Sequence, residues 1–123
     1  MIVAGFGMRA GATATSLRDA LTATGAAPDL LAAAIDHAPR VAALAETLSL
    51  PLVAIAADAL AAPQTVTHSP AAQAARGTGS VAEAAALAAA GPGARLLVPR
   101  RIAPDRMATC AIATSLPAPE PRS

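Results

Sequence analysis

The stretch "VAGFGMRAGATATSLRDAL", residues 3–21, decides the fold. Apolar residues 2–7 predict a short buried strand, and residues 14–24 predict a helix with Thr13 as its N-cap. A glycine-rich turn that joins a strand to a helix N-terminus is suited to hold an anion, because free backbone N–H groups and the positive helix end face it. The candidate ligand-binding residues of this turn are Gly5, Gly7, Arg9, Gly11 and Thr13.

The rest of the chain continues to alternate between helices and strands. The segments 52–56, 94–99 and 107–114 predict strands, and residues 29–32 predict a helical turn before a short strand at 34–36. Further helices are expected before Pro51, over 70–76 and between Ser80 and Gly91. This order predicts an α/β fold, a three-layer α/β/α sandwich around a mostly parallel sheet of about five strands. The last two strands are close enough to form a hairpin, which makes the sheet mixed.

A second glycine-rich turn opens the stretch "GTGSVAEAAAL", residues 77–87. It also leads into a helix, so Gly77, Gly79 and Ser80 are candidates for a second anion site. The alternative is structural, since Ser80 and Glu83 have the spacing of a helix capping box.

Arg100 and Arg101 follow the strand predicted at 94–99. The carboxyl ends of parallel strands form the ligand-binding edge of open α/β sheets, and Arg9 is expected at the same edge. Guanidinium groups recognise carboxylates, so this edge predicts a ligand that carries several of them. The alternative is a solvated turn between two strands.

The composition excludes several classes of function. Phe6 is the one aromatic residue, which argues against stacking on single-stranded nucleic acid, and the net charge of +1 indicates no strongly charged partner. All nine basic residues are arginine, so no lysine is available for a Schiff base or a phosphate loop. The single Cys110 cannot form an internal disulfide and is expected to be buried, and His37 and His68 lack partners at metal-ligand spacing. We expect no metal, no cofactor, no membrane span and no leader segment, and hence a cytoplasmic protein.

A nucleotide-binding module is a further alternative from the first glycine turn. The dinucleotide fingerprint requires G-x-G-x-x-G, whereas Gly11 comes one residue late. Asp36 stands near the position of a ribose-binding acid.

Taken in order, "GFGMRAGAT", "GTGSVAEAAAL" and "ARLLVPRR" followed by "MATCAIA" resemble the cobalamin-biosynthesis family that contains CobE and the C-terminal domain of CbiG. The resemblance covers residues 2–114. The family's first motif usually reads Gly-x-Gly-Cys-Arg-x-Gly, and Met8 stands in place of its cysteine. Arg100 stands where the family usually carries lysine.

The resemblance implies one CobE-like domain over residues 1–115. The tail at 116–123 is proline-rich, and this composition predicts disorder. The resemblance also implies a protein of corrin-ring assembly that binds or processes a precorrin-type tetrapyrrole, with other enzymes of the pathway as candidate partners. A lactone hydrolase acting on a cobalt-precorrin, as in CbiG-like proteins, is the alternative activity. Precorrins carry many carboxylates, which agrees with the arginines and glycine turns singled out above.

Overall fold

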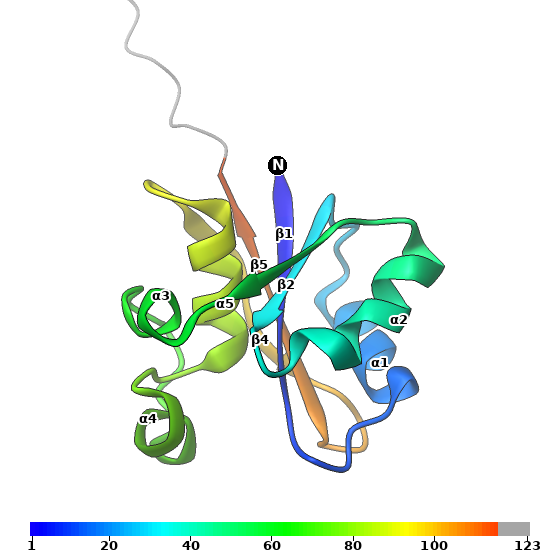
Figure 1. Cartoon of the computed structure of the whole chain (residues 1–123), viewed down its shortest axis with the longest axis horizontal. Helices are drawn as coiled ribbons and strands as arrows, with labels where there is room; N and C mark the ends of the chain where they lie inside the picture. The colour runs from blue at the N-terminus through cyan, green and yellow to red at the C-terminus, as the bar shows by residue number, and fades with distance from the viewer. Residues whose placement is uncertain (116–123) are drawn as a thin grey trace, which may run out of the picture.

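The computed structural model describes residues 1–115, which form one mixed sheet between two layers of helices (Figure 1). The sheet has five strands in the order β3-β2-β1-β5-β4. β1, β2 and β3 are parallel, whereas β5 runs antiparallel to both β1 and β4. The strands are β1 (Ile2–Met8), β2 (Leu30–Ala34), β3 (Leu52–Ile55), β4 (Arg95–Ile102) and β5 (Ala108–Thr114). The predicted fold class is therefore confirmed, including the final hairpin.

Helices cover both faces of the sheet. α1 (Ala14–Thr24) and α2 (Ala38–Leu48) cover one face, and α3 (Ala57–Ala61), α4 (Pro70–Arg76) and α5 (Val81–Ala90) lie on the other (Figure 1). Of this second group, the alanine-rich α5 makes the main contact with the central strands. In residues 1–115, no helix is both long enough and apolar enough to cross a membrane.

β1 shows why this sequence forms a tightly packed central strand. Ala4 and Phe6 point into the core beneath α1 and α2, while Val3 points into the core beneath α5. Gly5 and Gly7 lie on the α5 side, and a Cβ atom at Gly5 would stand 2.2 Å from the carbonyl oxygen of Ala82. The glycines therefore let α5 approach the strand to a distance that a side chain would prevent.

Helix ends follow the sequence closely. Thr13 caps α1, where it accepts from the Ser16 amide while the Ser16 hydroxyl accepts from the Thr13 amide, and the helix ends at Gly25 in the left-handed region. Ser80 accepts from the amide of Glu83 to cap α5, which ends at Gly91. These boundaries are confirmed.

The predictions around β2 and at the ends of β1 and β4 need correction. The helical turn predicted at 29–32 and the strand predicted at 34–36 are both wrong, since Leu30–Ala34 is a single strand. β2 lies between β1 and β3 with every residue buried, so pairing on both sides overrides the helical preference of leucine and alanine. β4 runs on to Ile102, which places Arg100 and Arg101 inside the strand, and β1 likewise includes Gly7 and Met8. The tail predicted at 116–123 lies outside the described residues.

Candidate functional site

A pocket of about 670 Å³ opens at the carboxyl ends of β1 and β4. Its walls come from the loop after β1, the start of α2, the helix α4, the start of α5 and the β4–β5 hairpin. The antiparallel course of β5 brings the end of β4 to the same edge as the end of β1, because Met8 pairs with Ala108 and Ile102 with Thr109. Arg9 and Arg100 therefore share one pocket, as the sequence predicts.

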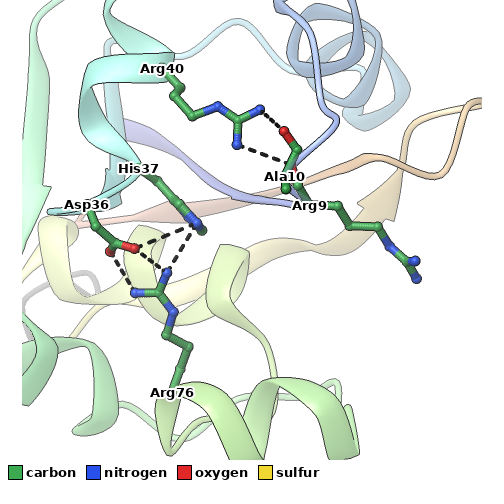
Figure 2. Close-up of polar contacts among 6 residues, drawn as sticks. All are labelled: Arg9, Ala10, Asp36, His37, Arg40 and Arg76. Carbon is green, nitrogen blue, oxygen red and sulfur yellow. Dashed lines mark hydrogen bonds and ion pairs between the residues drawn. The ribbon is translucent and has the colours of Figure 1, made fainter.

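Four arginines line this pocket, and no Asp or Glu of residues 1–115 is among its lining residues. The cations are Arg9, Arg76, Arg100 and Arg106. Within the described chain, the guanidinium groups of Arg9, Arg100 and Arg106 make no hydrogen bond or ion pair. Figure 2 shows the Arg9 side chain extending away from Asp36, Arg40 and Arg76. Three cations are thus available to an anionic ligand.

Arg76 differs from these three because it is paired. Its guanidinium donates two hydrogen bonds of 2.7 Å to the carboxylate of Asp36, and its Nη2 lies 3.1 Å from Nε2 of His37 (Figure 2). The hydrogen bond from Arg76 lowers the pKa of Asp36 to about 2, and the bond to Asp36 raises the pKa of Arg76. Asp36 is paired with Arg76 and is not among the residues that line the pocket, which argues against the nucleotide alternative.

His37 lines the pocket in its neutral form. Burial, followed by the charges of Arg76 and Arg40, lowers the pKa of His37, although Asp36 acts in the opposite direction. Since arginine can only donate, Nε2 of His37 accepts from Arg76 and the ring proton belongs on Nδ1. The fixed charge of the pocket therefore comes from its arginines.

The loop after β1 is held from behind by Arg40 of α2. Its guanidinium donates to the carbonyl oxygens of Arg9, Ala10 and Ala12 at 3.1, 3.0 and 2.6 Å (Figure 2). The Arg9 amide donates to the carbonyl of Met107 at 2.8 Å. The loop thus presents carbonyls to Arg40, and its contribution to the pocket is the Arg9 side chain. Sequence reasoning missed Arg40, which lies 28 residues from Ala12 in a helix of ordinary composition.

Glu83 does not complete the predicted capping box. Its carboxylate turns away from the Ser80 amide and accepts hydrogen bonds from Val66, Thr67 and the main-chain amide of Arg100. Burial by itself raises the pKa of Glu83, and these hydrogen bonds outweigh it, so the pKa lies below its ordinary value. The Ser80 half of the prediction is confirmed and the Glu83 half is wrong, because several donors across the fold compete with one amide nearby.

The structure brings four of the ten predicted site residues to the pocket: Gly7, Arg9, Ser80 and Arg100. The other six have different surroundings. Gly5 lies beneath α5, and a Cβ atom at Gly79 would meet the carbonyl oxygen of Thr67 at 2.5 Å. Thr13 and Gly77 cap α1 and α4, Arg101 is exposed on β4, and a Cβ at Gly11 would meet the end of the Met107 side chain.

Arg76, Arg106 and His37 reach the pocket although they were not predicted as ligand-binding residues. Arg106 stands in the "RRIAPDR" turn with a positive φ of 61°, and Asp105 beside it accepts from the buried hydroxyl of Ser16. The composition of that turn was a usable signal for Arg106. Arg76 ends a short alanine-rich helix, and nothing local marks it.

Metal-binding and thiol chemistry find little support in the described part of the chain. Residues 1–115 contain no group of three or more His, Cys, Asp or Glu side chains that could hold a metal ion. Cys110 is fully buried in β5, as predicted, and burial raises the pKa of its thiol.

The comparison with protein families gives a match over almost the whole described chain. The family described as cobalamin synthesis G C-terminus matches residues 2–113. The chain belongs to this family. Two of the family's motif positions discussed above, those of Met8 and Arg100, line the same pocket.

Solved structures of cobalamin biosynthesis proteins are similar to this chain. The chain is 35% identical to CobE, a protein from the cobalamin (vitamin B12) biosynthetic pathway, with a TM-score of 0.81 over 97% of this chain and 93% of that one. It is 37% identical to cobalamin biosynthesis protein chiG from Agrobacterium tumefaciens, with a TM-score of 0.68 over 93% of this chain and 98% of that one. A cobalamin biosynthesis protein G homolog from Sulfolobus solfataricus shares the fold at 21% identity and a TM-score of 0.70, over 92% of this chain and 36% of that one. No curated protein matches the sequence.

Proposed function

We propose that this protein acts in cobalamin biosynthesis by binding a precorrin-type tetrapyrrole intermediate in the pocket at the carboxyl ends of β1 and β4. The observation that carries the proposal is the set of three unpaired guanidinium groups, those of Arg9, Arg100 and Arg106, around a pocket without acidic lining residues in the described chain. Precorrins carry acetate and propionate groups around an apolar ring, and each guanidinium is suited to one carboxylate.

The remaining lining fits the apolar part of such a ligand. Met8, Val81, Ile102 and Met107 contribute aliphatic and thioether side chains, and the volume of about 670 Å³ is within the ordinary range of ligand sites. Thioether side chains adapt to irregular shapes, which suits the face of a puckered macrocycle. Family membership supports the same pathway, since CobE and chiG are named as cobalamin biosynthesis proteins.

The lining favours binding over hydrolysis. The hydroxyls of Ser69 and Ser80 cap helices, and Nε2 of His37 accepts from Arg76, so neither serine that lines the pocket is activated by His37. Lactone hydrolysis by this chain is the alternative, and formation of a ring-opened product would support it.

A visible-absorbance titration tests the proposal. Hydrogenobyrinic acid, a metal-free corrin with carboxylic acid side chains, is the probe, and its own spectrum is followed because the protein has no Trp or Tyr. We expect a saturable spectral change with the unmodified protein. The Kd should rise about tenfold in Arg9→Ala and in Arg100→Ala, because each variant loses one charged hydrogen bond to the ligand. Arg18→Ala, on the exposed face of α1, is the matched control and is expected to bind like the unmodified protein. The absence of a saturable change in the unmodified protein would overturn the proposal.

A further inference from the structure

Glu83 is the only charged side chain among the buried residues of the described chain, with 0% of its surface exposed. It stands in the first turn of α5, beside the pocket-lining residues Ser80 and Val81. A buried carboxylate without a cation is costly unless hydrogen bonds satisfy it. The hydrogen-bond donors around Glu83 therefore indicate which parts of the chain it fixes in place.

Each oxygen of the Glu83 carboxylate accepts two hydrogen bonds. Oε1 accepts from the amides of Val66 and Thr67 at 2.7 and 2.8 Å. Oε2 accepts from the Thr67 hydroxyl at 2.6 Å and from the Arg100 amide at 2.8 Å. With both oxygens occupied and no exposed surface, Glu83 cannot contact a ligand or act as a base. Its effect on the pocket must pass through the groups that it holds.

The two parts of the chain that Glu83 holds, Val66 with Thr67 and the main chain of Arg100, lead directly into walls of the pocket. Residues 66–69, which we name the strap, end at Ser69, where α4 begins with its pocket-lining Ala71, Ala72 and Arg76. The Ser69 amide donates to the carbonyl of Gly79 at 2.7 Å, which fixes the end of the strap against the turn before α5. Glu83 therefore ties the α4 wall to the β4 wall.

Arg100 needs this support because it lies at an irregularity of an edge strand. The register of β4 against β5 shifts between Val98 and Arg101, and Arg100 is not among the paired positions of the ladder. Its neighbour Pro99 has no amide to donate. The carboxylate of Glu83 supplies the acceptor that the strand does not, and so fixes the main chain from which the Arg100 side chain enters the pocket.

We infer that Glu83 is a positioning residue for ligand binding, which holds Arg100 and the strap in the geometry that receives a carboxylate-bearing ligand. This inference rests on the proposed function, since it concerns the same pocket. It assigns to Glu83 a role that is distinct from capping α5.

The substitution Glu83→Gln distinguishes the link from Glu83 to Arg100 from the link between Glu83 and the strap. An amide has one accepting oxygen, which can still receive the amides of Val66 and Thr67, and its nitrogen can donate to the Thr67 hydroxyl. The same nitrogen would then face the Arg100 amide, so two donors would meet. E83Q is therefore expected to release Arg100 while the strap remains attached.

A double-mutant cycle with hydrogenobyrinic acid tests this. E83Q and R100A are each expected to raise the Kd, R100A by about tenfold and E83Q by less, because each weakens the same charged hydrogen bond to the ligand. The double variant should bind within about twofold of R100A alone, whereas E83Q and R9A should combine multiplicatively. Multiplicative losses for E83Q and R100A, or an unchanged Kd in E83Q, would overturn the inference. A failure of the unmodified protein to bind would instead overturn the proposed function.

Thr67→Val is the matched control for a purely structural role. It removes one hydrogen bond to Glu83 and leaves the Arg100 amide in place, so it should lower stability but change the Kd by less than about twofold. Equal effects of T67V and E83Q on the Kd would contradict positioning through Arg100. If E83Q fails to fold, amide hydrogen exchange of the unmodified protein decides: the probe should slow exchange at Arg100, Val66 and Thr67 together, and unchanged exchange at Val66 and Thr67 would overturn the inference.

Discussion

Nη2 of Arg40 lies 2.6 Å from the carbonyl oxygen of Ala12, and the same guanidinium also reaches the carbonyls of Arg9 and Ala10. A cation therefore offsets the partial negative charge of three carbonyls in the loop after β1. The glycine-rich loop is therefore suited to an anion through the side chain of Arg9, with its main chain held by α2.

Replacing Arg40 with alanine should loosen this loop. We expect a loss of about 1–2 kcal/mol in the free energy of unfolding, since a charged donor to several carbonyls is removed and part of it is solvated. The Kd for hydrogenobyrinic acid should also rise, because Arg9 loses its fixed main chain. Chemical denaturation and the absorbance titration measure the two effects. Arg18→Ala is the control, and an R40A variant as stable as R18A would show that the contacts carry no net energy.

The close approach of α5 to β1 makes a second prediction. A methyl group at Gly5 would stand 2.2 Å from the Ala82 carbonyl oxygen and 2.4 Å from the Ala86 nitrogen, both main-chain atoms of α5. Gly5→Ala should cost about 3 kcal/mol or more, because the helix as a whole must move. In Gly11→Ala the added methyl meets only the end of the Met107 side chain, which can turn away. A Tm of G11A that is equal to or lower than the Tm of G5A would contradict this packing argument.

Local signals account for most of the fold that was predictable from sequence. Thr13 and Gly25 delimit α1, and Ser80 and Gly91 delimit α5, because capping depends on residues a few positions apart. β2 could not be predicted in the same way. Its sequence "LLAAA" favours a helix locally, and only its place between two strands makes it extended.

The pocket likewise combines residues that the sequence predicts with residues that it does not. The edge of the sheet and the cations Arg9 and Arg100 follow from the rule that ligands bind at the carboxyl ends of parallel strands. The roles of Arg40 and Glu83 depend on partners 28 and 17 residues away, which no periodicity reveals. Gly5 was assigned to an anion-binding turn because a glycine gives the same signal whether a ligand or a helix approaches it.

The Asp36–Arg76 pair predicts a pH dependence of stability. The hydrogen bond from Arg76 lowers the pKa of Asp36 from 3.8 to about 2, so the folded state favours the carboxylate more than the unfolded state does. The stabilisation is complete above pH 3.8 and is lost as the pH falls towards 2. Because Asp36 is 58% exposed, we expect a contribution below about 1 kcal/mol.

Denaturation of the unmodified protein and of Asp36→Asn between pH 6 and pH 2 measures this contribution. D36N should be the less stable protein at pH 6, and the difference should shrink as the pH falls from 3.8 towards 2, the folded-state pKa of Asp36. Asp19→Asn on α1 serves as the control. A difference between D36N and the unmodified protein that stays constant down to pH 2 would show that it does not arise from ionisation of Asp36.

Thr13 distinguishes a helix cap from a ligand contact within the first glycine motif. Its hydroxyl accepts from the Ser16 amide at 3.1 Å, its own amide donates to the Ser16 hydroxyl at 3.0 Å, and it does not line the pocket. Thr13→Ala should therefore cost about 1 kcal/mol in the free energy of unfolding and leave the Kd for hydrogenobyrinic acid unchanged within about twofold. Thr15→Ala, at an exposed position of the same helix, is the control and should cost less. A tenfold rise in the Kd of T13A beside normal binding by T15A would mean that the ligand reaches the start of α1, and that the site extends from Arg9 along the whole loop.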